Sequence, residues 1–403
     1  MVERFQKILD NGLKIWFDPK PLGDCKIQLN FSSGSIDETI PSTAHLIEHI
    51  QGCTSTIYGN GSLAYSNSNA YTSLEALGYY FGCIVPEDFE DGLELIARVF
   101  DRPDLKIMER ERAAVRHELL GKVNPFNALN ESIFTQLFPN HAKIMKSISQ
   151  ELEGLPRITE EAIIEYWNKF YDPRNAVLYL GGELPENVEE LVGNFASTPQ
   201  RSPLESFEHS WPMEPDLSKR LEIIEKLNDK PVASINIHYQ IPLFPHDTDI
   251  RDWLVYGALI GYLNKSHGPL YSKLRDSLEL VYRLNIETHG SGRAGRLLFS
   301  CETGNSSSWP EIESAWQRTI NDIANIGIPN AEYEMQKKNY RINLIHNSQS
   351  FDITGMESEF KNGITKQEIT RSILGITSED IRKKADEIRK KNYIISVVLP
   401  KNA

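Results

Sequence analysis

His45-Leu46-Ile47-Glu48-His49 is the stretch on which the prediction of fold and function rests. In an α-helix, residues four apart share a face, so His45 and His49 can direct two imidazoles to one point. Two imidazoles from one helical turn suit a Zn²⁺ ion that takes one more protein ligand and a water. Glu48 borders the same face and could accept a proton from that water. The pattern therefore predicts a zinc site with an adjacent base.

A helix with two histidines on its solvated surface would have the same sequence pattern. The zinc interpretation therefore needs a third ligand as support. The segment 108–120 is highly charged, and its default interpretation is a solvated helix with salt bridges. However, Glu111, Val115 and Glu118 fall on one helical face, and a carboxylate from a second helix is what the histidines lack. Glu118 is the candidate. Glu109, Glu111 and His117 remain as alternatives.

Length and composition describe an ordinary globular protein of more than one domain. A chain of 403 residues exceeds the usual size of one hydrophobic core. The formal net charge of −13 disfavours nucleic acid and anionic membranes as partners. The sequence has no long apolar run, no leader pattern at its start, and four scattered cysteines that indicate reduced thiols. We therefore expect a cytoplasmic protein without a membrane segment.

Prolines and strand patterns divide the chain. Residues 195–218 contain four prolines among polar residues and show no periodicity, which is typical of a linker. Strands are expected in a hairpin around Asn11-Gly12 and at 26–31, 77–85, 176–180, 232–239 and 393–399. The prediction is an N-terminal domain 1–198 with the zinc site, a linker 199–218 and a C-terminal domain 219–403.

The two halves end alike. Ile158-Thr159-Glu160-Glu161, a helix and a strand from Ala176 match Ile376-Thr377-Ser378-Glu379, a helix and a strand from Ile394. This likeness indicates a duplication, although two unrelated helix–strand units could resemble each other by chance. The expected fold is α+β, with two similar domains that each have a mostly antiparallel sheet with helices packed on it.

The chain resembles the pitrilysin family of inverted zinc metallopeptidases, which includes insulysin and the mitochondrial processing peptidase. The landmarks are the H-x-x-E-H stretch, Asn69-Ala70-x-Thr72-x-x-Glu75, and Glu111 followed seven residues later by Glu118. In the family, the second of these helical glutamates is the third zinc ligand. The resemblance therefore implies one Zn²⁺ per chain on His45, His49 and Glu118, with Glu111 as a supporting carboxylate of the catalytic site.

The second half carries a further landmark. Leu274-Arg275 followed by Tyr282 is similar to a family element whose arginine and tyrosine hold substrate carbonyls over the zinc. Without the resemblance, these residues read as a surface arginine and a half-buried tyrosine. One departure from the family pattern is Ser42, which stands where a glycine is common.

The resemblance implies a zinc metalloendopeptidase that cuts short or unfolded peptides. Glu48 would be the general base and Tyr282 would help to stabilise the oxyanion. The Asn69-Ala70 segment would be an edge strand to which the substrate adds in extended form. Short two-domain members pair two chains around a chamber, so we expect a homodimer, or a heterodimer with a related chain.

Two other functions fit the same fold. One is a noncatalytic scaffold subunit, although such subunits have usually lost metal ligands that are present here. The other is a protease that trims a leader peptide only together with a second, different chain.

Overall fold

The structure is a computed structural model that describes residues 5–20, 23–54, 65–201, 209–228, 231–347 and 365–402. The chain divides into two compact units. The first is built mainly from Met1–Asn124 and Ile144–Ser210, and the second mainly from Pro125–Lys143, Trp211–Ile345 and Glu357–Ala403. The division after Ser210 falls inside the predicted linker. Pro125–Lys143, which the sequence analysis assigned to the first domain, belongs to the second unit.

The first unit contains a mixed sheet. Six strands of the described residues pair in the order β1-β2-β6-β3-β5-β4. Their bounds are β1 (Phe5–Ile8), β2 (Lys14–Pro19), β3 (Cys25–Phe31), β4 (Tyr65–Thr72), β5 (Leu77–Ile84) and β6 (Ala176–Gly182). The β1–β2 hairpin turns at Gly12, whose φ of 87° requires the left-handed region that glycine adopts readily.

The second unit repeats this arrangement. Five strands of its described part pair in the order β7-β11-β8-β10-β9. Their bounds are β7 (Leu221–Asn228), β8 (Ala233–Ile241), β9 (Arg283–Ser291), β10 (Ala294–Thr303) and β11 (Tyr393–Pro400). In each sheet one pair is parallel, β2 with β6 and β7 with β11, and the other pairs are antiparallel. The predicted α+β fold with two similar domains is confirmed, although the strands β7, β9 and β10 were not predicted from the sequence.

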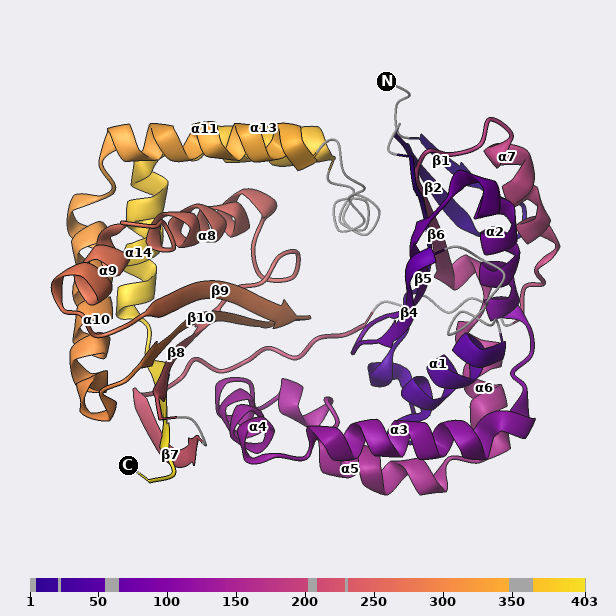
Figure 1. The fold of residues 1–403 in the computed structure, drawn as a ribbon, viewed down its shortest axis with the longest axis horizontal. Coiled ribbons are helices and arrows are strands. Elements are labelled where there is room, and N and C mark those ends of the chain that lie inside the picture. Colours follow the sequence, from indigo (N-terminus) through magenta and orange to yellow (C-terminus); the bar gives the residue numbers. More distant parts are fainter. Residues whose placement is uncertain are drawn as a thin grey trace. The chain divides into compact units, whose positions relative to one another are not determined.

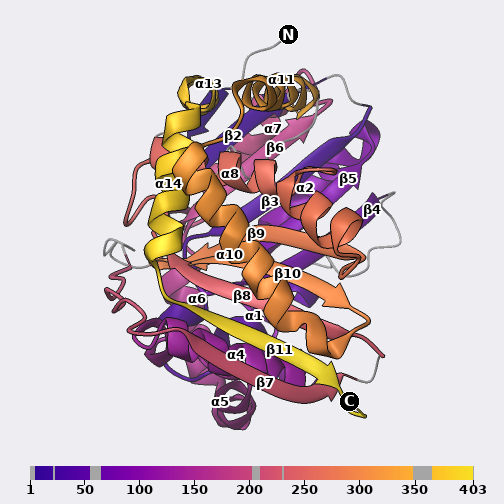
Figure 2. The ribbon, with the colours of Figure 1, turned by 90° about the vertical axis from the view of Figure 1, so that its left-hand side faces the viewer.

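Helices cover one face of the first sheet, and helices pack on both faces of the second (Figure 1). Those of the first unit are α1 (Thr43–Thr54), α2 (Phe89–Ala97), α3 (Met108–Lys122), α5 (Ile148–Gly154), α6 (Glu160–Phe170) and α7 (Val188–Leu191). Those of the second are α4 (Pro125–Leu137), α8 (Ile250–Leu263), α9 (Pro269–Tyr271), α10 (Trp309–Ile326), α11 (Asn330–Asn347), α13 (Lys366–Gly375) and α14 (Ser378–Lys390). Figure 2 shows α10 and α14 side by side in front of the strands.

Helix α4 joins the second unit because its apolar side chains pack there. Ile133 and Leu137 of α4 are buried in one cluster with Ile394 of β11, and Ile223 of β7 packs against this cluster. Burial of such side chains stabilises a contact by about 1.5–3 kcal/mol each. The segment therefore follows its hydrophobic partners and not its place in the sequence.

The predicted likeness between the ends of the two halves is also present. Thr159 accepts a hydrogen bond from the backbone of Ala162 at the start of α6, and Thr377 does the same for Asp380 at the start of α14. Each helix leads into the strand that forms the parallel pair of its sheet. The repeated sequence therefore encodes the same capped helix and the same central strand.

Among the helices of the described ranges, none is long and apolar enough to cross a membrane.

Gly182 offers a test of the first sheet. Its φ is 90°, and a Cβ at this position would lie 2.0 Å from the carbonyl oxygen of Asp24. Gly182→Ala should lower the free energy of unfolding by about 3 kcal/mol, because both the backbone conformation and the contact are strained. Gly121→Ala is the matched control: it lies in α3, a Cβ there meets nothing within 4 Å, and alanine favours the helix. Equal urea unfolding midpoints for the two variants would contradict this account.

Candidate metal centre

A buried carboxylate shapes the start of α1. Glu38 accepts hydrogen bonds from the backbone N–H groups of Ser42, at 3.0 Å, and Ala44, at 2.9 Å. These donors belong to the first turn, where no backbone acceptor is available. Ser42 itself has a φ of 72°, in the left-handed region that favours glycine. This conformation explains why glycine is common here in the family that the chain resembles.

One face of α1 is apolar and buried, and the two histidines lie beside it. Leu46, Ile47 and Ile50 are fully buried in the core of the first unit. His45 and His49 lie one turn apart beside this apolar face, with ring centroids separated by 5.0 Å. The helical spacing therefore brings both imidazoles to one side, as predicted.

Helix α3 supplies a carboxylate to the same point. Glu118 Oε2 lies 3.3 Å from His45 Nε2, and Glu118 Oε1 lies 3.3 Å from His49 Nε2. The ligand atoms of these three residues all lie within 4.8 Å of one another. Zinc bonds of about 2.0–2.2 Å place tetrahedral ligand atoms roughly 3.4 Å apart, so the donor set fits Zn²⁺ in chemistry and in spacing.

Glu111, one of the alternatives for the third ligand, occupies a different position. Its Oε2 lies 3.4 Å from the other ring nitrogen of His49, Nδ1, and its Oε1 accepts a hydrogen bond from Arg110 Nε at 2.6 Å. The carboxylate is buried, whereas about half of the Glu118 side chain is exposed. A carboxylate behind a metal-binding histidine orients the ring, so this geometry suits a supporting residue.

Glu48 is held by the end of the edge strand. Its side chain is buried, and its Oε2 accepts a hydrogen bond from Thr72 Oγ1 at 2.8 Å. Thr72 is the last residue of β4, and among the described strands β4 pairs with β5 alone, at the edge of the sheet. Thr72 is a landmark of the sequence to which no role was assigned, and its contact with Glu48 is visible only in the fold.

These residues line one cleft of about 750 Å³ within the first unit. The histidines, Glu48 and Glu118 form part of its wall, and residues 69–74 of β4 and the following turn form another part. Asn69 is exposed and Ala70 is buried. The predicted edge strand therefore runs along the same cleft as the two histidines.

Burial changes the charge of two groups in this cleft. It lowers the pKa of His45 to about 4, and the neighbouring His49 contributes in the same direction, so His45 is neutral at pH 7. A neutral imidazole is the form that binds metal. Burial also raises the pKa of Glu38 to about 7, against the opposing effect of its two backbone hydrogen bonds.

Arg275 and Tyr282 lie together in the second unit. Arg275 belongs to the π-helix Ser272–Ser277, and its Nη1 donates a hydrogen bond to the backbone oxygen of Tyr282 at 3.0 Å. Its guanidinium also lies 4.8 Å from the centre of the Tyr282 ring. The Tyr282 side chain is 80% exposed. Tyr282 is thus more exposed than the half-buried tyrosine considered as the alternative.

Comparisons with known proteins agree with this fold. Residues 157–340 match the family described as "Peptidase M16 inactive domain". This match does not include His45, Glu48, His49 or Glu118. The chain is similar to the "Uncharacterized zinc protease YmfH" of Bacillus subtilis, with 23% identity over 218 residues that cover 49% of this chain and 50% of that protein.

Two further proteins extend the likeness. The mitochondrial presequence protease of Xenopus laevis is 24% identical over 374 residues, which cover 81% of this chain and 35% of that protein. The chain therefore spans half or less of these two relatives. A protease from Helicobacter pylori has the same fold, with a TM-score of 0.80, 18% identity, and coverage of 99% of this chain and 100% of that one. Residues 157–340 are thus similar to the M16 peptidase family, which agrees with the resemblance to the pitrilysin family, and the fold is that of M16-like peptidase structures.

The raised pKa of Glu38 predicts a pH dependence of stability. The folded protein keeps this proton up to a pH of about 7, whereas the ordinary value is 4.5. The stability that the neutral carboxyl permits is therefore complete below pH 4.5 and is lost as the pH rises through about 7. Glu38→Gln cannot ionise, so it should remove a decline on the order of 3 kcal/mol between these limits.

The measurement is the unfolding free energy of wild type and Glu38→Gln in urea at several pH values across this range. Subtracting the two curves cancels groups that both proteins share, His45 among them. Glu90→Gln, at an exposed position of α2, should leave the wild-type curve unchanged. Parallel curves for wild type and Glu38→Gln would rule out the assigned role of Glu38.

Proposed function

We propose that this protein is a zinc metalloendopeptidase that hydrolyses short or unfolded peptides. The observation that carries the proposal is the convergence of three metal donors, His45, His49 and Glu118, in one cleft with Glu48. The names of the Bacillus and Xenopus relatives describe them as proteases, and the first also as a zinc protease. One Zn²⁺ per chain is proposed.

Each residue of the cleft has a part in the proposed reaction. Zinc bound there would polarise the scissile carbonyl and lower the pKa of a water to roughly 7. Glu48 would take the proton of that water and pass it to the leaving amine. The hydrogen bond from Thr72 keeps the Glu48 carboxylate in one orientation. Glu111 would hold the His49 ring through Nδ1, which leaves Nε2 for the metal.

The edge strand supports a peptide as the substrate. A chain in extended form could add to β4 through backbone hydrogen bonds, with Asn69 and Ala70 beside the zinc site. Such recognition depends little on side chains, so it suits peptides that are already unfolded. The Xenopus relative is named for presequences, which agrees with a peptide substrate.

A cytoplasmic location remains a prediction.

Arg275 and Tyr282 of the second unit form a proposed substrate-binding element. Arg275 and Tyr282 would hold substrate carbonyls over the zinc and stabilise the oxyanion. We propose that they act on the zinc site of a second copy, in a homodimer that encloses a chamber. A heterodimer with a related chain would use the same contacts.

The description "inactive domain" favours a second candidate function, a noncatalytic scaffold subunit. In that case the donor set would hold no metal and the protein would cut nothing.

The first test is cleavage of an unstructured peptide mixture, followed by mass spectrometry, together with zinc analysis. Glu48→Gln should keep its zinc and lose a factor of about 10²–10⁴ in rate, because only the base is removed. His49→Ala and Glu118→Ala should lose the zinc. Glu90→Gln, a carboxylate outside the cleft, should behave as wild type. A wild type with zinc that cuts nothing would indicate a missing partner chain, and one without zinc or activity would favour the scaffold.

Mixing two inactive variants tests the homodimer. Tyr282→Phe keeps the zinc helix, and Glu48→Gln keeps the tyrosine. If the two elements act across two copies, an equimolar mixture that exchanges subunits should recover about a quarter of the wild-type sites. No recovery, with subunit exchange verified by mass measurement, would mean that the elements do not act across copies.

A further inference from the structure

Two aromatic rings contact the guanidinium of Arg275, and one of them has no part in the proposed reaction. The guanidinium carbon lies 4.8 Å from the centre of the Tyr282 ring and 5.2 Å from the centre of the Tyr271 ring. Both distances lie within the range of cation–π contacts, which extends to about 6 Å. Tyr271 is therefore a second aromatic partner of the arginine in the proposed substrate element.

The place of the Tyr271 ring follows from the burial of the residues beside it. Leu270 and Leu274, four residues apart, are fully buried in the core of the second unit. Tyr271 and Arg275 have the same spacing one residue further along the chain, so their side chains lie together on a neighbouring side of the helical segment. His267 packs against the edge of the Tyr271 ring, with ring centroids 5.8 Å apart. The buried leucines thus fix the segment that carries both the ring and the cation.

A reversal of the chain brings Tyr282 back to the same guanidinium. Glu279 has a φ of 53°, a left-handed conformation that a residue other than glycine keeps only where its surroundings hold it. Next to it, the backbone N–H of Leu280 donates a hydrogen bond to the backbone oxygen of Leu274 at 2.9 Å. Arg275 Nη1 donates to the backbone oxygen of Tyr282 at 3.0 Å. The reversal is therefore tied to the helical segment at two points.

The contacts restrain the guanidinium without using up its hydrogen-bond donors. A guanidinium carries five N–H donors in one plane. An aromatic ring attracts the cation through its quadrupole, which requires no directed hydrogen bond. The bond to the backbone oxygen of Tyr282 uses one donor, and within the described residues no ion pair with a carboxylate uses another. Donors therefore remain for an acceptor such as a substrate carbonyl.

We propose that Tyr271 is a positioning residue of the substrate element. Together with Tyr282, its ring holds the Arg275 guanidinium in an orientation in which the remaining N–H donors can meet a substrate carbonyl. The use of Arg275 on a substrate rests on the proposed peptidase function. The restraint itself involves residues of the second unit alone.

Two substitutions separate the Tyr271 ring from its hydroxyl. Tyr271→Phe keeps the ring, so it should change kcat/KM for an unstructured peptide by less than about twofold. Tyr271→Leu removes the ring but keeps an apolar side chain. It should lower kcat/KM roughly twofold to fivefold, as expected for the loss of a cation–π contact at an exposed site.

A double substitution asks whether Tyr271 acts through Arg275. In the Arg275→Gln background, Tyr271→Leu should cause no further loss of kcat/KM, because the cation that the ring holds is absent. A local loss of folding would instead lower the rate in both backgrounds. The zinc content should equal that of the wild type in every variant, since the metal donors belong to the first unit.

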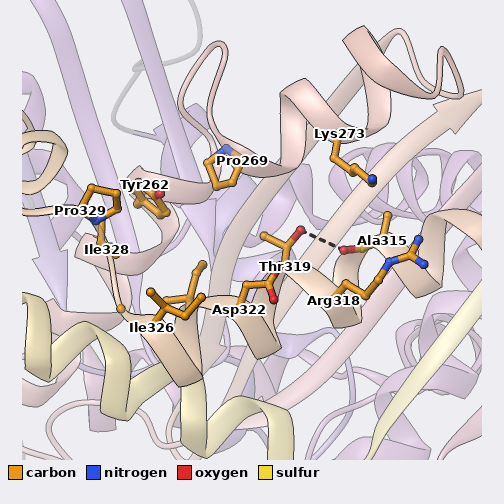
Figure 3. A pocket seen from close by; sticks show the side chains of 12 residues that line it. Tyr262, Pro269, Lys273, Ala315, Arg318, Thr319, Asp322, Ile326, Ile328 and Pro329 are labelled. Atoms are coloured by element: carbon orange, nitrogen blue, oxygen red, sulfur yellow. Dashed lines mark hydrogen bonds between the residues drawn. The ribbon is translucent and has the colours of Figure 1, made fainter.

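Lys273→Gln is the matched control. Lys273 is an exposed residue of the same π-helix, and it lines a cavity of about 360 Å³ beside α10 (Figure 3). Its substitution removes a positive charge from the π-helix but leaves Arg275 and both rings in place. The variant should therefore cut the peptide at the wild-type rate.

The orientation of Arg275 can also be followed without any cleavage. In protein with isotope-labelled arginine, the Nε–H resonance of Arg275 is assigned by its absence from the Arg275→Gln spectrum. Ring currents displace the resonances of protons that lie over an aromatic ring. Tyr271→Leu should therefore shift this resonance, whereas Tyr271→Phe should leave it near its wild-type position.

The two measurements separate this proposal from the proposed function. An unmoved Arg275 resonance in Tyr271→Leu would overturn the positioning role, as would an equal loss of kcat/KM with and without Arg275. A wild type that cuts nothing but shows the expected shift would defeat the peptidase function and leave the restraint of Arg275 by Tyr271 in place.

Discussion

The packing of α1 against α3 is the contact on which the metal centre depends. Leu46, Ile47 and Ile50 of α1 and Val115 and Leu119 of α3 are fully buried in one core. Each such side chain contributes about 1.5–3 kcal/mol of hydrophobic stabilisation. The three donors themselves gain little from being together without a metal, because two imidazoles and a carboxylate are polar groups that water would otherwise solvate. Apolar contacts nearby therefore hold polar ligands at a spacing that suits a metal.

Polar contacts orient the side chains that apolar packing brings into the cleft. Glu38 satisfies backbone donors at the start of α1, Thr72 holds the base, and Glu111 faces the far side of one imidazole. Buried polar groups are costly unless they find partners, so each of these contacts removes a penalty and also fixes an orientation. Together they join α1 to the segment before it, to the edge strand and to α3.

The two units share one topology but carry different side chains at corresponding positions. Helix α8 follows β8 as α1 follows β3, with the same strand order around it. Within its residues, Ile250–Leu263, α8 contains no histidine, and its buried positions are apolar or aromatic. The second unit instead carries the Arg275–Tyr282 pair, whose arginine belongs to the π-helix Ser272–Ser277. π-helical turns are rare in proteins, and those that occur are often found at functional sites.

Local patterns in the sequence were sufficient to predict several elements of the fold and part of the metal centre. The spacing of His45 and His49 predicts a shared face because helical period is a local property, and Asn11-Gly12 predicts the hairpin for the same reason. The repeated helix and strand at the ends of the halves predicted the two similar domains. The choice between Glu111 and Glu118 was different, because both lie near one face of α3 and only its packing on α1 shows which carboxylate reaches both Nε2 atoms. The contact of Thr72 with Glu48, the cap by Glu38 and the place of α4 in the second unit were likewise decided by tertiary structure, since each joins segments whose partners no local pattern identifies.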